Sequence, residues 1–180
     1  MRPKQIIVWQ LVRDVVAKTN MAVIAELQAY DNLIAQVNFQ PGTIMEINET
    51  LQQMTGGTEA YSRYPLFAML FSFDESKGQT IGQDCTVDCK FVIARRANAI
   101  DKVPARYDNN FIPVLYPVYL EFLNQLYLDQ RFDTQSPDNI PHIKTDFPYF
   151  DTGETDKDPL SDTVDAIQIK IKLRILFKNC

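Results

Sequence analysis

The sequence has little of the residue types that small proteins use for covalent staples, metal sites and acid–base chemistry. Its 180 residues include three cysteines and one histidine. An odd number of cysteines without a regular spacing makes no disulfide framework and is typical of reduced thiols in a reducing compartment. The hydrophobic content of 46% is ordinary for a globular protein. We therefore expect a hydrophobic core that is stable without disulfides or a structural metal.

The sequence also lacks a long apolar run and an excess of basic charge. No stretch approaches the roughly 20 apolar residues of a membrane span. Gln10, Arg13 and Asp14 interrupt the apolar N-terminal segment, so we expect neither a cleaved signal peptide nor a membrane partner. The formal net charge of −5 argues against a general nucleic-acid binder, which needs basic patches. It remains compatible with a protein that lets DNA pass without holding it.

The three thiols belong to Cys85, Cys89 and Cys180. Cys85 and Cys89 lie four residues apart in a segment with strand periodicity, which places them on one face about 13 Å apart. That separation is too large for a disulfide. A zinc site would depend on carboxylates, because His142 is the lone histidine. We therefore interpret Cys85 and Cys89 as small buried hydrophobic residues.

Apolar periodicity predicts a helix, a strand and a second helix near the N-terminus. In residues 5–18, two adjacent series of apolar residues recur at every fourth position, which predicts an amphipathic helix. The sequence leaves open whether this helix extends past Asn20 or a hairpin begins there. Residues 33–40 alternate like a half-buried strand that ends at Pro41-Gly42. Thr43 with Glu46 forms a capping box, which predicts a helix that runs to Gly56-Gly57.

The middle of the chain predicts a hairpin and a proline-bearing helix. "YPLFAMLFSFDES" is apolar on both faces and "DCTVDCKFVIARR" alternates, so we expect a long hairpin whose first strand is covered on both sides. Pro113 suits the first turn of the following helix, and Pro117 would kink or restart it. The apolar stripe of that helix consists of Phe111, Leu115, Val118, Phe122 and Leu126.

The last part of the chain predicts an irregular arm and a final strand. Residues 132–164 lack periodicity and contain four prolines and, from Asp133 to Asp158, seven acidic residues. "AIQIKIKLRILFK" alternates between an apolar face and a basic face. The basic face consists of Lys170, Lys172, Arg174 and Lys178. A phosphate site is one interpretation, but we favour a solvated face or a contact to the acidic arm of a neighbouring subunit.

These elements predict the α+β class. We expect one domain over residues 1–180, with a mostly antiparallel sheet of about four strands and two to three helices packed on it. Residues 132–164 form the extended acidic, proline-rich arm in this interpretation.

Residues 151–153 spell Asp-Thr-Gly, the tripeptide of aspartic proteases. Such an enzyme needs two carboxylates that share a proton, each on a turn held by a following apolar strand. Here the acidic, proline-broken "ETDKDPLSD" follows, and no second copy of the motif exists, so activity would require a homodimer. A dimeric protease that uses Asp151 is therefore the less favoured alternative, and we assign no catalytic residue.

The same loop contains a set of hard oxygen ligands that suits calcium. The set consists of Asp151, Glu154, Asp156 and Asp158, but it lacks the EF-hand spacing. Phosphate-cradling, serine-hydrolase and zinc-protease motifs are missing from the sequence. His142 has no nucleophile near it in sequence, so we interpret it as a hydrogen-bonding or surface residue. We expect no enzyme, no cofactor and no bound metal.

Six segments resemble the head–tail connector and tail-terminator (tail-completion) ring proteins of tailed bacteriophages, and connector rings of crAss-like phages match as well. "VNFQPGTIMEINETLQQM" resembles their strand and capped helix, and "YPLFAMLFSFDESKG" with "CTVDCKFVIARR" resembles their long hairpin. "RYDNNFIPVLYPVYLEFLNQL" and "PHIKTDFPYF", with the closing "DAIQIKIKLRI", resemble the late helix, arm and last strand. The likeness covers most of the chain from about residue 30 onward. It is one of architecture, since no single motif is diagnostic.

The resemblance implies a non-enzymatic virion subunit of the neck that assembles in the host cytoplasm. Its expected partners are further copies of itself in a ring, neighbouring portal, connector or tail proteins, and genomic DNA that crosses the lumen without specific binding. Acidic walls would keep the duplex from sticking, and a basic face with an acidic arm suits the head-to-tail contacts of a ring. The alternative from another class is a small homo-oligomeric binding domain with an acidic arm and calcium as its candidate ligand.

Overall fold

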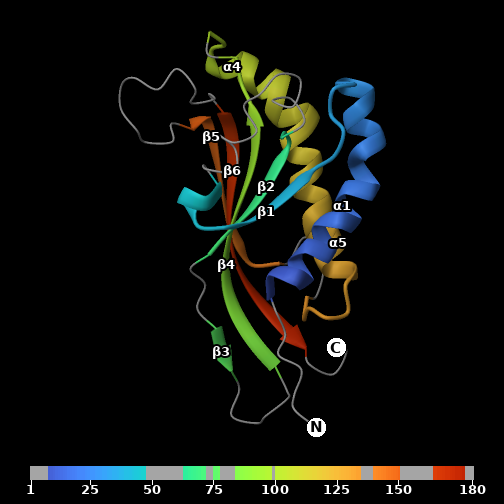
Figure 1. Ribbon diagram of the computed structural model, residues 1–180, viewed down its shortest axis with the longest axis vertical. Coiled ribbons are helices and arrows are strands. Elements are labelled where there is room, and N and C mark those ends of the chain that lie inside the picture. The colour runs from blue at the N-terminus through green and yellow to red at the C-terminus, as the bar shows by residue number, and fades with distance from the viewer. Residues whose placement is uncertain are drawn as a thin grey trace.

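A layer of helices packs on one face of a mixed β-sheet, and residues 44–47 form a helical turn on the other side (Figure 1). The computed structural model describes residues 8–47, 63–71, 75–77, 84–98, 100–134, 140–150 and 164–176. The helical elements are α1 (Val8–Tyr30), α4 (Val103–Arg106), the π-helical η1 (Tyr107–Leu115) and α5 (Tyr116–Leu128). The strands are β1 (Asn38–Gly42), β2 (Leu66–Leu70), β3 (Glu75–Lys77), β4 (Asp84–Arg96), β5 (His142–Phe150) and β6 (Val164–Leu176).

The sheet has the strand order β1-β2-β4-β6-β5, and the short β3 pairs with β4. β1 and β2 run parallel, whereas the other neighbours are antiparallel. The central ladder joins β4 to β6 from Asp84 opposite Leu176 to Arg96 opposite Val164, and it runs nearly the length of the molecule in Figure 1. The predicted α+β class is confirmed, but the main path has five strands, with β3 beside it, where about four were expected.

The additional strand comes from the predicted arm. Residues 142–150 pair with β6, so the expectation that residues 132–164 are irregular throughout is wrong for this segment. Proline hid the strand, because Pro148 cannot donate to a ladder and suits an edge or a bulge. The register does shift between Phe147 and Phe150 at the edge of the sheet. Residues 151–163 of the arm lie outside the described residues.

The first strand begins later than its alternation predicted. Residues 33–37 form a loop, in which Leu33 N–H donates to Asp31 Oδ1 and Val37 N–H donates to Asn20 Oδ1. Pro41 and Gly42, expected to end the strand, belong to β1. The predicted range 33–40 is therefore wrong at both ends, because side-chain hydrogen bonds hold its first residues away from the ladder.

Pro41 also blunts the outer edge of β1. Asn38 N–H donates to Pro65 O, and Phe71 N–H donates to Gly42 O, each over 2.8 Å. In a parallel ladder alternate residues bond to the same neighbour, so Pro41 faces away from β2. A residue without an N–H at this place removes a donor that a further strand would use. With Pro148 in β5, both outer strands of the described sheet carry a proline.

α1 is one continuous helix, which settles the question left open at Asn20. Its buried face consists of Val8, Val12, Val15, Val16, Thr19, Val23 and Leu27. The capping box at Thr43 is confirmed as well. Thr43 N–H donates to Glu46 Oε2 over 2.7 Å, and Glu46 N–H donates to Thr43 Oγ1 over 3.2 Å. The rest of that predicted helix, up to Gly56, lies outside the described residues.

The late helix accommodates its two prolines by a change of helix type. Pro117 lies in the first turn of α5, as the predicted restart requires. Pro113 lies inside η1 rather than in a first turn, so that expectation is wrong. A proline clashes with the carbonyl four residues earlier, and the wider π-helical turn bonds one residue further back. Tyr116 N–H accordingly donates to Phe111 O.

Two apolar cores lie on opposite faces of the sheet. The larger core packs α1, η1 and α5 on β4 and β6, and the predicted helical stripe around Phe122 is fully buried in it. The smaller core holds Leu66, Ala68 and Val164 on the other face. β2 serves both cores because Phe67 and Met69 point to the larger one. The expectation that this strand is covered on both sides is therefore confirmed.

Candidate functional site

The basic face of β6 is exposed and extends onto β4. The structure confirms the predicted alternation: Ile169, Ile171 and Leu173 are buried, whereas the residues between them are exposed. We define the basic sheet face as Lys90, Lys170, Lys172 and Arg174, together with Asp88 and Ile143 between and beside them. All six side chains are exposed, and they lie on the face opposite the larger core.

The charges of the basic sheet face are only partly balanced by the acidic residues that the structure describes. Lys172 Nζ lies 3.7 Å from Asp88, and Arg174 Nη1 lies 2.9 Å from Asp133, which belongs to the predicted acidic arm. Lys90 and Lys170, by contrast, stand directly opposite each other in the ladder. Like charges in opposite positions destabilise a sheet. An acidic group from outside would relieve this repulsion.

The outer side of η1 and α5 forms a second exposed surface. We define the helix stripe as Ile112, Leu120, Tyr127 and Leu128, with Asp108 and Glu121 as its charged residues. The four apolar side chains are 57%, 60%, 40% and 58% exposed. Residues 107–128 contain no lysine or arginine, so the surface carries only negative charge. It is the largest run of exposed apolar side chains on the described helices.

A polar cluster holds β5 against α5. Tyr116 O–H donates to Asp146 Oδ2 over 2.9 Å, and Lys144 Nζ lies 2.6 Å from Asp146 Oδ1. Lys144 Nζ also lies 4.4 Å from the centre of the Tyr116 ring. Burial and the bond to Asp146 raise the pKa of Tyr116 to about 12. Tyr116 therefore stays a neutral donor at physiological pH and anchors the edge strand.

His142 belongs to the same contact. Its Nδ1 lies 2.6 Å from Ile140 O, and its Nε2 contacts the Tyr119 hydroxyl. A carbonyl only accepts, so Nδ1 carries a proton and donates to Ile140 O, while Nε2 shares a hydrogen bond with the Tyr119 hydroxyl. The interpretation of His142 as a hydrogen-bonding residue is confirmed.

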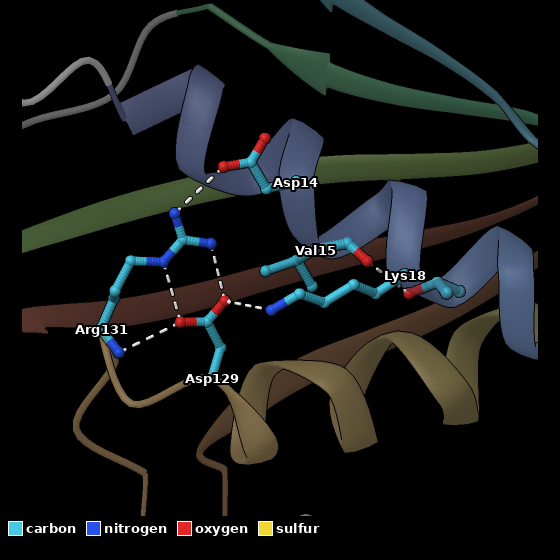
Figure 2. Close-up of polar contacts among 6 residues, drawn as sticks. Asp14, Val15, Lys18, Asp129 and Arg131 are labelled. Carbon is cyan, nitrogen blue, oxygen red and sulfur yellow. Dashed lines mark hydrogen bonds and ion pairs between the residues drawn. The ribbon is translucent and has the colours of Figure 1, made fainter.

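Asp129 joins α1 to the end of α5 (Figure 2). Its carboxylate accepts from Lys18 Nζ over 3.1 Å and from Arg131 Nε and Nη2 over 2.9 and 2.7 Å, while Arg131 Nη1 donates to Asp14 over 3.0 Å. Burial alone would raise the pKa of Asp129, but hydrogen bonds from Arg131 and Lys18 lower it well below its usual range. The charge is needed for contacts between helices and is not available to a substrate.

Asp165 is a second enclosed carboxylate, at the other end of the helix layer. Its two oxygens accept from Arg106 Nη1 over 2.8 Å and from Asn110 Nδ2 over 2.6 Å. Arg106 also donates to Asp101 O and Asn98 O. Asp165 and Arg106 are 0% and 2% exposed. This network fixes α4 and η1 on the sheet.

The cysteine predictions are confirmed in the described part of the chain. Cys85 and Cys89 are buried free thiols on the core face of β4. Burial raises the pKa of Cys89 to about 12, which keeps its thiol protonated and unreactive. Cys180 lies outside the described residues.

The acidic loop itself stays a sequence prediction. Asp151, Glu154, Asp156 and Asp158, like Lys178, lie outside the described residues. Within the described ranges, no group of three or more His, Cys, Asp or Glu side chains could hold a metal ion. None of the helices in that same part of the chain is long and apolar enough to cross a membrane.

Sequence reasoning missed the β5 contact and the helix stripe. His142, Lys144 and Asp146 alternate in "HIKTDFPYF" and face α5, so a period of two was present between the prolines. The helix stripe could have been found from the apolar residues left over after the buried face was assigned. No signal in the sequence linked Asp165 to Arg106, which lies 59 residues earlier.

No protein-family model matches this chain, and no curated protein matches it significantly.

Proposed function

We propose that the protein is a virion structural subunit that forms a ring in the neck of a tailed bacteriophage, as a head–tail connector or tail terminator. The ring would join the portal to the tail and let the genome pass through its lumen. Assembly would take place in the host cytoplasm, where buried free thiols such as Cys85 and Cys89 stay reduced.

One observation supports this proposal: the strands of the segments that resemble the phage proteins join into a single sheet, and the late helix packs on it. The strand and the capped turn at Thr43 come before the hairpin of β2 and β4. The two strands of this hairpin pair antiparallel, with Leu66 opposite Ala94. The late helix and β6 follow, and β6 pairs along the whole of β4. The departure from the expected pattern is β5, which adds an edge strand within the arm.

The proposal assigns no catalytic role to the enclosed carboxylates. Asp129 and Asp165 are both neutralised by arginines of the same chain. The net charge of −5 fits a lumen that does not retain DNA.

Native mass spectrometry and negative-stain imaging of the purified protein over a range of concentrations test the proposal. We expect closed rings with a lumen wide enough for a DNA duplex. A protein that remains monomeric at its highest soluble concentration would contradict the proposal. Loss of a measurable peptidase activity in Asp151→Asn, or melting that depends on calcium, would support the alternatives instead.

A further inference from the structure

We propose that neighbouring copies of this chain bind head to tail, with the helix stripe of one copy on the basic sheet face of the next. The inference rests on the proposed ring function and names its interface. The residues that define the two surfaces are largely exposed in the part of the chain that the structure describes.

The helix stripe has the geometry of a contact surface. In an α-helix Tyr127 lies seven residues, or nearly two turns, after Leu120, so the two side chains point in almost the same direction. Ile112 and Asp108 continue this line on η1, where four residues make nearly one π-helical turn. Three large apolar side chains thus follow one line along η1 and α5, and Leu128, 58% exposed, lies beside this line, next to Tyr127. An apolar patch of this kind that is exposed to water is typical of a surface that binds another protein.

The basic sheet face complements this stripe in charge. It carries four basic side chains and one acidic one, Asp88, whereas residues 107–128 carry Asp108 and Glu121 and no basic residue. The facing lysines, Lys90 and Lys170, repel each other in the free protein. Ile143, 64% exposed, adds an apolar contact beside Lys170. Lysine stems supply more apolar area once their charges are paired.

The position of the two surfaces on the fold sets the symmetry of the contact. α5 packs on the face of the sheet that carries Phe91 and Ile169, and Lys90 and Lys170 point from the opposite face. One copy therefore presents the two complementary surfaces on opposite sides. Such an interface repeats in one orientation from copy to copy, and it closes into a ring when the rotation between successive copies adds up to a full turn. Pro41 and Pro148 disfavour the alternative in which copies join through the outer edges of their sheets.

Charge reversal with mixing tests this contact directly. The first variant, Lys90→Glu with Lys170→Glu, has an acidic sheet face, and the second, Asp108→Lys with Glu121→Lys, has a basic helix stripe. We expect each variant alone to lose the rings at a concentration where the wild type is fully assembled. An equimolar mixture should restore association into oligomers in which the two variants alternate, because each stripe then meets a sheet face of opposite charge.

A control pair separates the interface from net charge. Lys102→Glu and Glu26→Lys change exposed residues outside both surfaces and should leave assembly unchanged. Leu120→Ser tests the apolar contact without a change of charge and should weaken assembly, while the melting temperature of the subunit stays the same. Circular dichroism of every variant verifies that the subunit is folded.

The outcomes distinguish this inference from the proposed function. If the wild type forms rings and both reversed variants still form them, the interface is wrong and the ring function stands. If the wild type forms no rings, the proposed function fails. If the variants lose assembly but their mixture does not recover it, the two surfaces do not bind each other. If Lys90→Glu with Lys170→Glu only abolishes retention of duplex DNA, the basic sheet face binds nucleic acid and the inference is overturned.

Discussion

Asp165 and Asp129 perform the same task in different surroundings. Each is a nearly buried carboxylate that receives hydrogen bonds from an arginine and ties helices to the rest of the molecule. The partners of Asp165 are themselves buried, since Arg106 is 2% and Asn110 5% exposed. The partners of Asp129 reach water, because the side chains of Lys18 and Arg131 are 45% and 21% exposed.

The exposure of the partner side chains determines how much stability is lost when the carboxylate is removed. An arginine that loses its carboxylate inside the protein cannot be rehydrated, so it retains an uncompensated charge. An arginine at the rim turns toward solvent and recovers most of its hydration. We therefore expect the network of Asp165 to be critical for folding and that of Asp129 to adjust the packing of α1 on α5.

Removal of the Asp165 carboxylate should have the largest effect. We expect Asp165→Ala to lower the free energy of unfolding by about 4 kcal/mol, because the charge of Arg106 stays buried. Urea unfolding followed by circular dichroism measures this change. Asp88→Ala, at an exposed carboxylate in a weaker ion pair, is the matched control and should cost no more than about 0.5 kcal/mol. Equal effects of the two variants would contradict the comparison.

Removal of the Asp129 carboxylate should have an intermediate effect. The group accepts four hydrogen bonds from Lys18 and Arg131, including one from the Arg131 backbone. We expect Asp129→Ala to lower the free energy of unfolding by about 2 kcal/mol, as is typical of hydrogen bonds to charged groups. The same urea experiment applies. If Asp129→Ala lowers the free energy of unfolding as much as Asp165→Ala, the exposure of Lys18 and Arg131 does not reduce the loss of stability, and the comparison is wrong.

The contribution of Asp129 should also depend on pH. Its pKa is lower in the folded protein than in the unfolded chain, so the carboxylate stabilises the fold above the unfolded pKa of about 3.9. The stabilisation declines as the pH falls from there toward the folded pKa. The difference in unfolding free energy between wild type and Asp129→Asn should therefore be constant from neutral pH down to about pH 5 and shrink below about pH 4. A difference that grows in acid would reverse the assigned sign.

The smallest effect is expected for Lys18. Its ammonium group is one of two cations on Asp129, and nearly half of its side chain is exposed. We expect Lys18→Met, which keeps the apolar stem, to cost about 0.5 kcal/mol at low salt and less at high salt. Thermal melts at two ionic strengths measure both values. A larger loss at high salt would be incompatible with a screened surface pair.

The features that the sequence predicted correctly depend on local patterns. The alternation of β6 and the helical stripe around Phe122 follow from the spacing of apolar residues within one element. The capping box needs only Thr43 and Glu46. The hairpin of β2 and β4 follows from two adjacent apolar runs.

The features that it could not predict depend on pairings over long distances. β5 holds two charged residues and Pro148, and only its contacts to β6 and α5 make it a strand. The partners of Asp165 and Asp129 come from elements far away along the chain. Pro113 was placed in a first turn because proline is normally excluded from helix interiors, and the π-helical turn that admits it depends on packing over the sheet.

The strand order has a consequence for how the chain is made. β6 lies between β4 and β5, although both of these precede it in the sequence. During synthesis the edge of β4 from Asp84 to Arg96 therefore stays unpaired until β6 has been made, and β5 has no neighbour in the sheet before then. β6 thus completes the described sheet by insertion between two strands that precede it in the sequence, and this sheet cannot form before β6 has been translated.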